Sequence, residues 1–244
     1  MLYKENIMNR GKLFIVATPI GNLGDITYRA VETLKLVDFI LCEDTRVTKI
    51  LLDHFQISKQ FVVVNAHNES KIIEKVFERL ESGESCALVS DAGTPCISDP
   101  GVRLVNKFIA YGIEVVGIPG ANAAIMALSI SGLPTDSFVF EGFLPQKKGR
   151  QKKLKQLMEE ERTIVLYEST YRIKKLLEEL NEYMPDRQIV VARELTKKFE
   201  ETWRGTASEI LYDFDKKIVK GEFVVTIAPL DWKERETQDH SEPY

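Results

Sequence analysis

Residues able to transfer protons or hold anions gather in four short segments, each directly after an apolar run. The segments span 18–25, 43–46, 67–69 and 91–99. We interpret each apolar run as a strand buried in a parallel sheet. Because the carboxyl ends of parallel strands meet at one edge of the sheet, we expect the four segments to line one site. The alternative, four ordinary strand-to-helix turns, stays open.

Carboxylates and one histidine in these segments are candidates for general-base chemistry. We single out Glu43, Asp44 and His67 for this role, although a histidine there could equally be a structural hydrogen-bonding group. Glu69 is a further candidate base. Arg46 has the forked geometry that holds a phosphate through two hydrogen bonds.

The stretch 86–101, CALVSDAGTPCISDPG, has the pattern of a ligand-binding loop. A buried strand over 86–90 leads into a turn at 91–95, and we expect a helix capped by Asp99 to begin at Pro100. Gly93 allows the backbone to approach a ligand closely. The chain has neither G-x-G-x-x-G nor a P-loop, so the dinucleotide-binding and P-loop hydrolase classes are disfavoured.

Alternation of strands and helices predicts an α/β fold with right-handed crossovers. We expect an N-terminal domain over 1–120 with a mainly parallel sheet, a C-terminal domain over 121–230 with a mixed sheet, and a polar tail over 231–244. The strands expected in the first domain are 13–17, 39–42, 61–64, 86–90 and 114–118, and those in the second include 163–167, 189–192, 201–205 and 223–227.

The overall composition is that of a globular protein without a membrane segment. The 244 residues carry a net charge of −4, with 44% hydrophobic and 29% charged residues. The three cysteines form no C-x-x-C pair, the three histidines have no zinc-like spacing, and no apolar run reaches the ~20 residues of a membrane span. We therefore expect a cytoplasmic protein with no metal and no membrane partner.

One basic segment stands out against this acidic background. It has six basic residues and no acid over 147–155, and it indicates a phosphate-contacting patch for RNA. The alternative is a solvated helix face. The candidate RNA-binding residues are Lys147, Lys148, Arg150, Lys152, Lys153 and Lys155.

Eight motifs in order resemble the tetrapyrrole methylase superfamily, and within it the branch that methylates ribosomal RNA of the small subunit. They are LFIVATPIGNLGDIT, CEDTR, HNE, LVSDAGTPCISDPG, GIPGANAA, FEGFLP, YEST and ARELTK, and they cover about 12–229. The first and fourth of these motifs favour the RNA branch over the porphyrin and corrin methylases.

The resemblance implies two α/β domains with S-adenosylmethionine in the cleft between them, a homodimer, and 2'-O-methylation of a cytidine ribose in the decoding region of 16S ribosomal RNA. The partner would be this RNA or the small ribosomal subunit. The cofactor-binding residues carried over by motif are Pro19, Asp91, Ala92, Gly93, Thr94, Pro95, Ser98, Asp99, Ala121, Asn122, Phe140, Glu141, Ala192, Arg193 and Thr226.

Methyl transfer from a sulfonium to a hydroxyl requires alignment of three atoms and no metal. We assign the substrate end to Glu43, Asp44 and Arg46. Glu168 and Glu194 could orient groups, or could be simple caps or ion pairs. Two other functions compete: methylation of a small tetrapyrrole, which leaves the basic segment without a use, and a non-catalytic RNA-binding module on the same fold.

Overall fold

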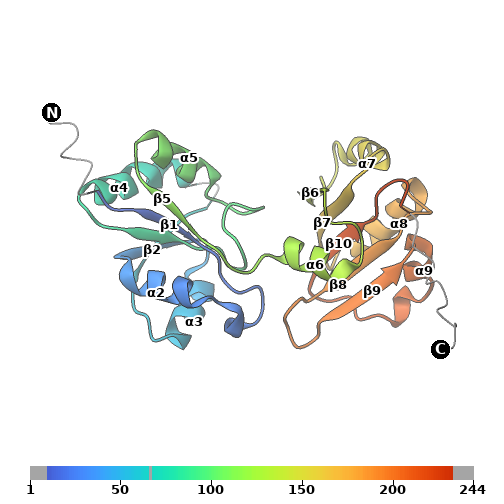
Figure 1. The fold of residues 1–244 in the computed structure, drawn as a ribbon, viewed down its shortest axis with the longest axis horizontal. Coiled ribbons are helices and arrows are strands. Elements are labelled where there is room, and N and C mark those ends of the chain that lie inside the picture. The colour runs from blue at the N-terminus through green and yellow to red at the C-terminus, as the bar shows by residue number, and fades with distance from the viewer. Residues whose placement is uncertain (1–9, 66–67, 233–244) are drawn as a thin grey trace, which may run out of the picture. The chain divides into compact units, whose positions relative to one another are not determined.

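The computed structural model describes residues 10–65 and 68–232, and within it the chain divides into two compact units (Figure 1). The first consists of Met1–Met126 together with Leu195–Lys198, and the second of Ala127–Glu194 and Phe199–Tyr244. The division falls inside helix α6 (Ala123–Ser131), six residues beyond the expected boundary at 120. The short segment 195–198 was not expected to belong with the first unit.

The first unit contains a five-stranded sheet in the order β3-β2-β4-β1-β5, and all of its strand pairs are parallel. The residues of β2 are fully buried, which explains the unbroken apolar run in the sequence. At the sheet edge, β3 is only partly covered. The strands are β1 (Leu13–Val16), β2 (Phe39–Cys42), β3 (Gln60–Val63), β4 (Cys86–Leu88) and β5 (Val115–Ile118).

Four helices cover this sheet, two on each face (Figure 1). One face packs against α2 (Tyr28–Leu36) and α3 (Thr45–His54), and the other against α4 (Glu69–Glu81) and α5 (Val102–Ala110). Right-handed crossovers require this arrangement, because the chain leaves β1 toward one edge of the sheet and leaves β4 toward the other.

Helix α5 begins at Val102, so the predicted start at Asp99-Pro100 is wrong. The chain turns three times before the helix, with positive φ at Cys96 (71°), Ser98 (63°) and Gly101 (120°). At Gly101 an added Cβ would lie 2.6 Å from Leu88 Cδ2, so this turn requires glycine. The Asp-Pro pair resembles a helix start but lies inside the loop.

The second unit has a mixed sheet in the order β6-β7-β10-β8-β9. Only β6 and β7 pair in parallel, and the other pairs are antiparallel. Both sheets and the fold class therefore agree with the prediction. The strands are β6 (Phe138–Phe143), β7 (Thr163–Ser169), β8 (Ile189–Arg193), β9 (Glu201–Gly205) and β10 (Glu222–Ile227).

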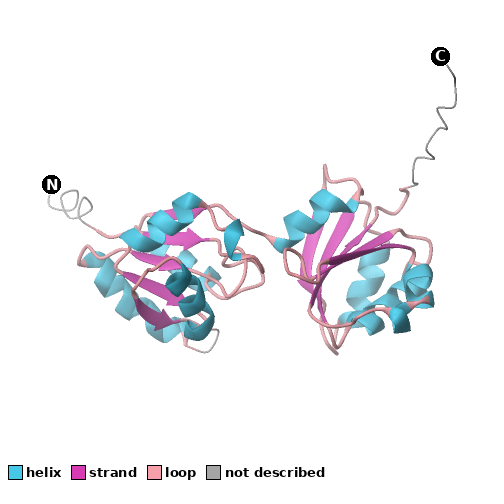
Figure 2. Ribbon diagram, turned by 90° about the horizontal axis from the view of Figure 1, so that it is seen from below, coloured by secondary structure: helices cyan, strands magenta, loops and turns pink. Residues whose placement is uncertain are grey.

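Three helices pack on one face of this second sheet, as Figure 2 shows, and enclose its core. They are α7 (Arg150–Met158), α8 (Ile173–Tyr183) and α9 (Ala207–Tyr212). A capping box between Thr206 and Glu209 starts α9. Helix α9 ends at Tyr212, and the chain then tightens into a 3-10 turn at Phe214–Lys216, where the buried Phe214 ring meets Trp203 edge-on. None of the helices in the described ranges is long and apolar enough to cross a membrane.

Candidate functional site

The carboxyl edge of the parallel sheet brings together the loops that follow β1 and β4. These two strands are neighbours, and the helices that follow them lie on opposite faces, which is the topological switch point where α/β sheets bind ligands. A two-residue bridge joins the loops: the Thr18 N–H donates to Gly93 O at 2.9 Å, and the Gly93 N–H donates to Thr18 O at 3.1 Å. The Thr18 hydroxyl also donates to Ser90 O at 3.0 Å.

Gly93 lies at a crowded point of this edge. Its φ is +79°, and an added Cβ would lie 3.2 Å from Ile20 Cγ2 and 3.6 Å from the Ala121 carbonyl oxygen. The Thr94 hydroxyl donates to that carbonyl at 3.0 Å. The loops after β1, β4 and β5 therefore meet here. Of the predicted cofactor residues, this junction includes Pro19, Gly93, Thr94 and Ala121, and the same β4–α5 loop carries Asp91, Ala92, Pro95, Ser98 and Asp99.

Carboxylates from two strand ends form an acidic cluster beside this junction. The Asp44 N–H donates to Asp91 Oδ1 at 3.2 Å, which joins the β2 and β4 ends. Partial burial raises the pKa of Glu43, and Asp91, Asp99 and Asp44 raise it further by repulsion. Burial likewise raises the pKa of Asp91 and of Asp99 above their usual range. A group with raised proton affinity suits a general base, and Glu43 has that property.

Asp44 and Arg46 differ from Glu43, because they satisfy each other. Arg46 Nε donates to Asp44 Oδ1 at 3.0 Å, and the Asp44 side chain also caps α3 by accepting from the Arg46 N–H. The hydrogen bonds from Arg46 lower the pKa of Asp44 to about 2. Asp44 is therefore a weak base. The Arg46 side chain is exposed at the same edge of the sheet.

The third segment contributes less than expected. His67 lies outside the described residues. Glu69 is buried, and its Oε1 accepts from the Leu104 N–H at 2.9 Å, so it joins α4 to α5 and is wrong as a candidate base. Asn122 caps the first turn of α6 through Oδ1, which accepts from the Ile125 N–H at 3.2 Å.

Sequence reasoning missed the contact between the first loop and the segment 195–198. An added Cβ at Gly21 would lie 2.3 Å from Lys197 Cγ and 3.0 Å from Thr196 Oγ1. Glycine at position 21 therefore admits a segment from far along the chain. The only local signal of this contact is the glycine at position 21, and it does not identify the segment that packs against it.

The second unit holds the other predicted cofactor residues. Phe140 and Glu141 lie at an irregularity of β6, where the register with β7 shifts between Phe140 and Gly142. Such bulges redirect side chains and are frequent beside binding sites. Glu141 forms an ion pair with Lys153, with Oε2 2.6 Å from Nζ.

The strand-end residues of β8 and β10 are engaged within the second unit. Ala192 is almost fully buried, and Arg193 Nε donates to Lys220 O at 2.7 Å. The buried Thr226 hydroxyl donates to Val190 O at 3.1 Å. Their cofactor contacts stay predictions, and the polar side chains already have partners.

The basic segment separates into exposed lysines and one buried arginine. Arg150 is 3% exposed, and its Nε donates to Glu179 Oε2 at 2.8 Å, so the prediction that it binds RNA is wrong. Lys153 is half-buried and paired with Glu141. The side chains that extend into solvent are those of Lys147, Lys148, Lys152 and Lys155.

Glu168 belongs to a buried charge network and is an ion-pair residue. It is 2% exposed, its Oε1 lies 2.7 Å from Arg172 Nε, and its Oε2 lies 3.8 Å from Arg150 Nη2. The two arginines also donate to the loop after β6, to Pro145 O from Arg150 and to Leu144 O from Arg172. The network therefore fixes the loop between β6 and α7.

No cluster of three or more metal-ligating side chains occurs within residues 10–65 and 68–232.

Comparison with known proteins identifies the class of this fold and site. A family model, Tetrapyrrole (Corrin/Porphyrin) Methylases, matches residues 12–211. The chain belongs to this family of methyltransferases. The solved structure of a cobalt precorrin-4 methyltransferase has the same fold, with a TM-score of 0.68, 17% identity, and coverage of 92% of this chain and 95% of that one. A diphthine synthase structure matches with a TM-score of 0.66 and 15% identity, over 88% of this chain and 89% of that one.

Sequence similarity is much higher to one group of methyltransferases. The chain is 51% identical to ribosomal RNA small subunit methyltransferase I of Synechocystis sp. over 220 residues, which is 89% of this chain and 79% of the relative. It is 46% identical to the protein of the same name from Thermotoga maritima, over 89% of this chain and 98% of the relative.

Proposed function

We propose that the protein uses S-adenosylmethionine to methylate the 2'-oxygen of a cytidine ribose in the decoding region of 16S ribosomal RNA. The observation that carries this proposal is the similarity to relatives named ribosomal RNA small subunit methyltransferase I, at 44–51% identity over 89–93% of the chain. We further propose that it acts in the cytoplasm as a homodimer.

The junction around Gly93 has the chemistry to hold the cofactor. S-adenosylmethionine carries a positive sulfonium and a positive amino group, and the acidic cluster of Glu43, Asp91 and Asp99 provides negative charge at the same edge. Glycine at position 93 lets the loops after β1, β4 and β5 pack closely at this edge, since a side chain there would meet Ile20 and Ala121. When bound, the cofactor supplies an activated methyl group.

We assign the other roles to residues at this edge and in the basic segment. Glu43 accepts the proton of the attacking hydroxyl, since its pKa is raised whereas that of Asp44 is lowered. Arg46 holds a phosphate of the substrate through its guanidinium. The exposed lysines of 147–155 hold further phosphates of the RNA.

Transfer of tritium from labelled S-adenosylmethionine tests the proposal directly. Small ribosomal subunits from cells that lack this methylation are the acceptor, and nuclease digestion maps the label. Label on a cytidine 2'-oxygen is the expected result. Label on a tetrapyrrole acceptor and none on RNA would replace the proposal with small-molecule methylation. RNA binding that needs no cofactor and yields no label would assign a non-catalytic module.

A further inference from the structure

The end of β6 carries an exposed aromatic ring, which the proposed catalytic edge does not use. Phe143 is the last residue of β6 and is 52% exposed, whereas the earlier residues of β6 are half-buried or buried and the next residue, Leu144, is 2% exposed. The half-exposed ring leaves an apolar face that a ligand can cover.

Neighbouring side chains hold the Phe143 ring in place. Tyr167 meets it at a ring-centroid distance of 5.7 Å and an angle of 61°, and the Arg172 guanidinium lies 5.7 Å from its centroid. Arg172 is itself fixed by Glu168, and it donates to the Leu144 carbonyl. The ring is therefore pre-oriented, and a ligand that stacks on it would lose little affinity to ordering the protein.

Phe143 borders a surface hollow of about 470 Å³ that opens toward α7. The same hollow is lined by Lys152 and Gln156, and by Gly149 at the start of the helix. The charge of Lys153 is matched by Glu141, whereas Lys152 has no ion-pair partner among the described residues. The hollow thus combines an apolar ring face, an amide and an uncompensated positive charge.

We propose that Phe143 is a stacking platform for an unpaired base of single-stranded RNA, with Lys152 on an adjacent phosphate. Single-stranded nucleic acid is bound by aromatic rings that stack on bases, next to cations that follow the backbone. Lys147, Lys148 and Lys155 continue the positive charge along the same loop and helix. Charge complementarity therefore favours RNA as the occupant. This inference rests on RNA as the substrate of the proposed function.

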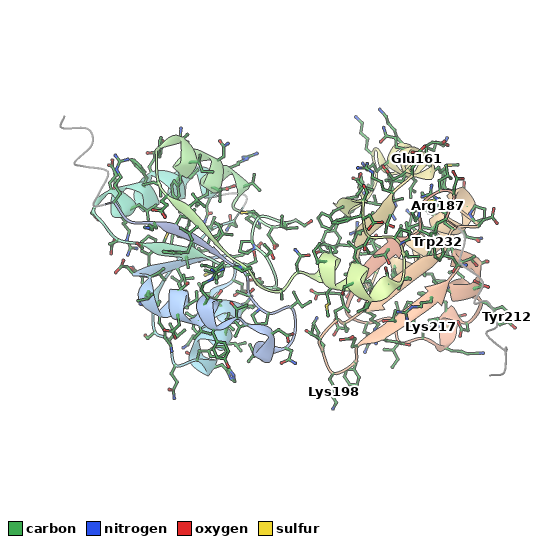
Figure 3. All side chains as sticks on the ribbon, in the orientation of Figure 1. Glu161, Arg187, Lys198, Tyr212, Lys217 and Trp232 are labelled. Atoms are coloured by element: carbon green, nitrogen blue, oxygen red, sulfur yellow. The ribbon has the colours of Figure 1, made fainter. Side chains whose placement is uncertain are left out.

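Replacing the ring while keeping an apolar side chain tests the inference. Phe143→Leu removes the aromatic face, Phe143→Trp retains it, and Tyr212→Leu is the matched control. Tyr212 is 91% exposed and is the last residue of α9, at the periphery of the second unit and away from α7 (Figure 3). The probe is a single-stranded RNA of about 12 nucleotides that contains 2-aminopurine, whose fluorescence is quenched by stacking.

We expect Phe143→Leu to weaken RNA binding by about 5-fold to 150-fold and to remove the quenching. Phe143→Trp and Tyr212→Leu should bind and quench as the wild type does. Wild-type affinity and quenching in Phe143→Leu would overturn the inference, and so would loss of RNA binding together with a change from dimer to monomer in light scattering, which would assign the ring to a protein interface.

Tritium transfer measured on the same preparations separates this inference from the proposed function. Wild-type protein that methylates the small subunit, with Phe143→Leu unaffected in binding, refutes the stacking platform alone. Wild-type protein that shows Phe143-dependent quenching but labels no RNA refutes the methylation of RNA alone.

Discussion

Replacement of Gly93 by alanine is the sharpest test of the cofactor loop. A non-glycine residue at φ +79° costs about 1–2 kcal/mol, and the added methyl group would lie 3.2 Å from Ile20 Cγ2, closer than ordinary contact. Both costs fall on the loop conformation that joins Thr18 to Gly93. The loop can relieve them by leaving that conformation, so the binding-competent fraction should fall by up to about 5-fold to 30-fold. We therefore expect the dissociation constant for S-adenosylmethionine to rise by the same factor.

Gly132→Ala provides the matched control. Gly132 has a φ of +77°, and an added Cβ would meet nothing within 4 Å. Both variants bear the backbone penalty, so both thermal unfolding temperatures should fall, and that of Gly93→Ala at least as far. Titration calorimetry should then show weakened cofactor binding for Gly93→Ala only. Wild-type cofactor affinity in Gly93→Ala, or equal weakening in both variants, would refute the assignment of the loop.

Three further predictions concern charged residues. Arg150→Met should lower the free energy of unfolding by about 3–5 kcal/mol, because it removes the cation that pairs with the partly buried Glu179 and lies beside Oε2 of the buried Glu168. The exposed Lys152→Met should change it by less than about 0.5 kcal/mol. Urea denaturation measures both, and equal small effects would contradict the buried network. Asp91→Asn should raise the unfolding temperature at pH 7, because it removes a charge that is unfavourable in the folded state. Burial raises the pKa of Asp91 in the folded state, so at pH values above 3.8 the folded state binds more protons than the unfolded state. The stability of the wild type therefore falls as the pH rises from 3.8 through the folded pKa. Thermal scans should show this advantage shrinking as the pH approaches 3.8, and a constant advantage would point to another cause. The double variant Lys148→Gln with Lys152→Gln should reduce the slope of log affinity for single-stranded RNA against log salt concentration by about 1.4. Lys153→Gln should change the slope less, since Lys153 is already paired with Glu141. An unaltered slope in the double variant would show that the lysines form a solvated helix face without RNA contacts.

Local patterns were sufficient to predict the two sheets and the loops at one edge. Continuous apolar runs such as 39–42 mark strands that are buried on both faces, and their parallel pairing places the polar residues that follow them together. The contact between Asp44 and Asp91 across two strand ends follows from that logic.

The errors arose where distant partners decide a residue's role. Arg150 belongs to a run of basic residues, but its carboxylate partners lie at 168 and 179, so its burial has no local signature. Glu69 likewise lies in a polar strand-end motif, yet its side chain bonds to the start of α5. At 96–101 the Asp-Pro signal for a helix start was overridden by a sequence of positive-φ turns.

The segment Leu195–Lys198 makes the first unit discontinuous along the chain. During synthesis from the N-terminus, the sheet, its helices and the Gly93 junction all emerge before the residues that pack at Gly21. The first unit therefore reaches its final state only after most of the second unit has been translated. A fragment that ends at Met126 would contain every strand of the first sheet and still lack the segment 195–198, which packs against the loop after β1. The fragment therefore could not reach the same folded state as the first unit of the intact chain.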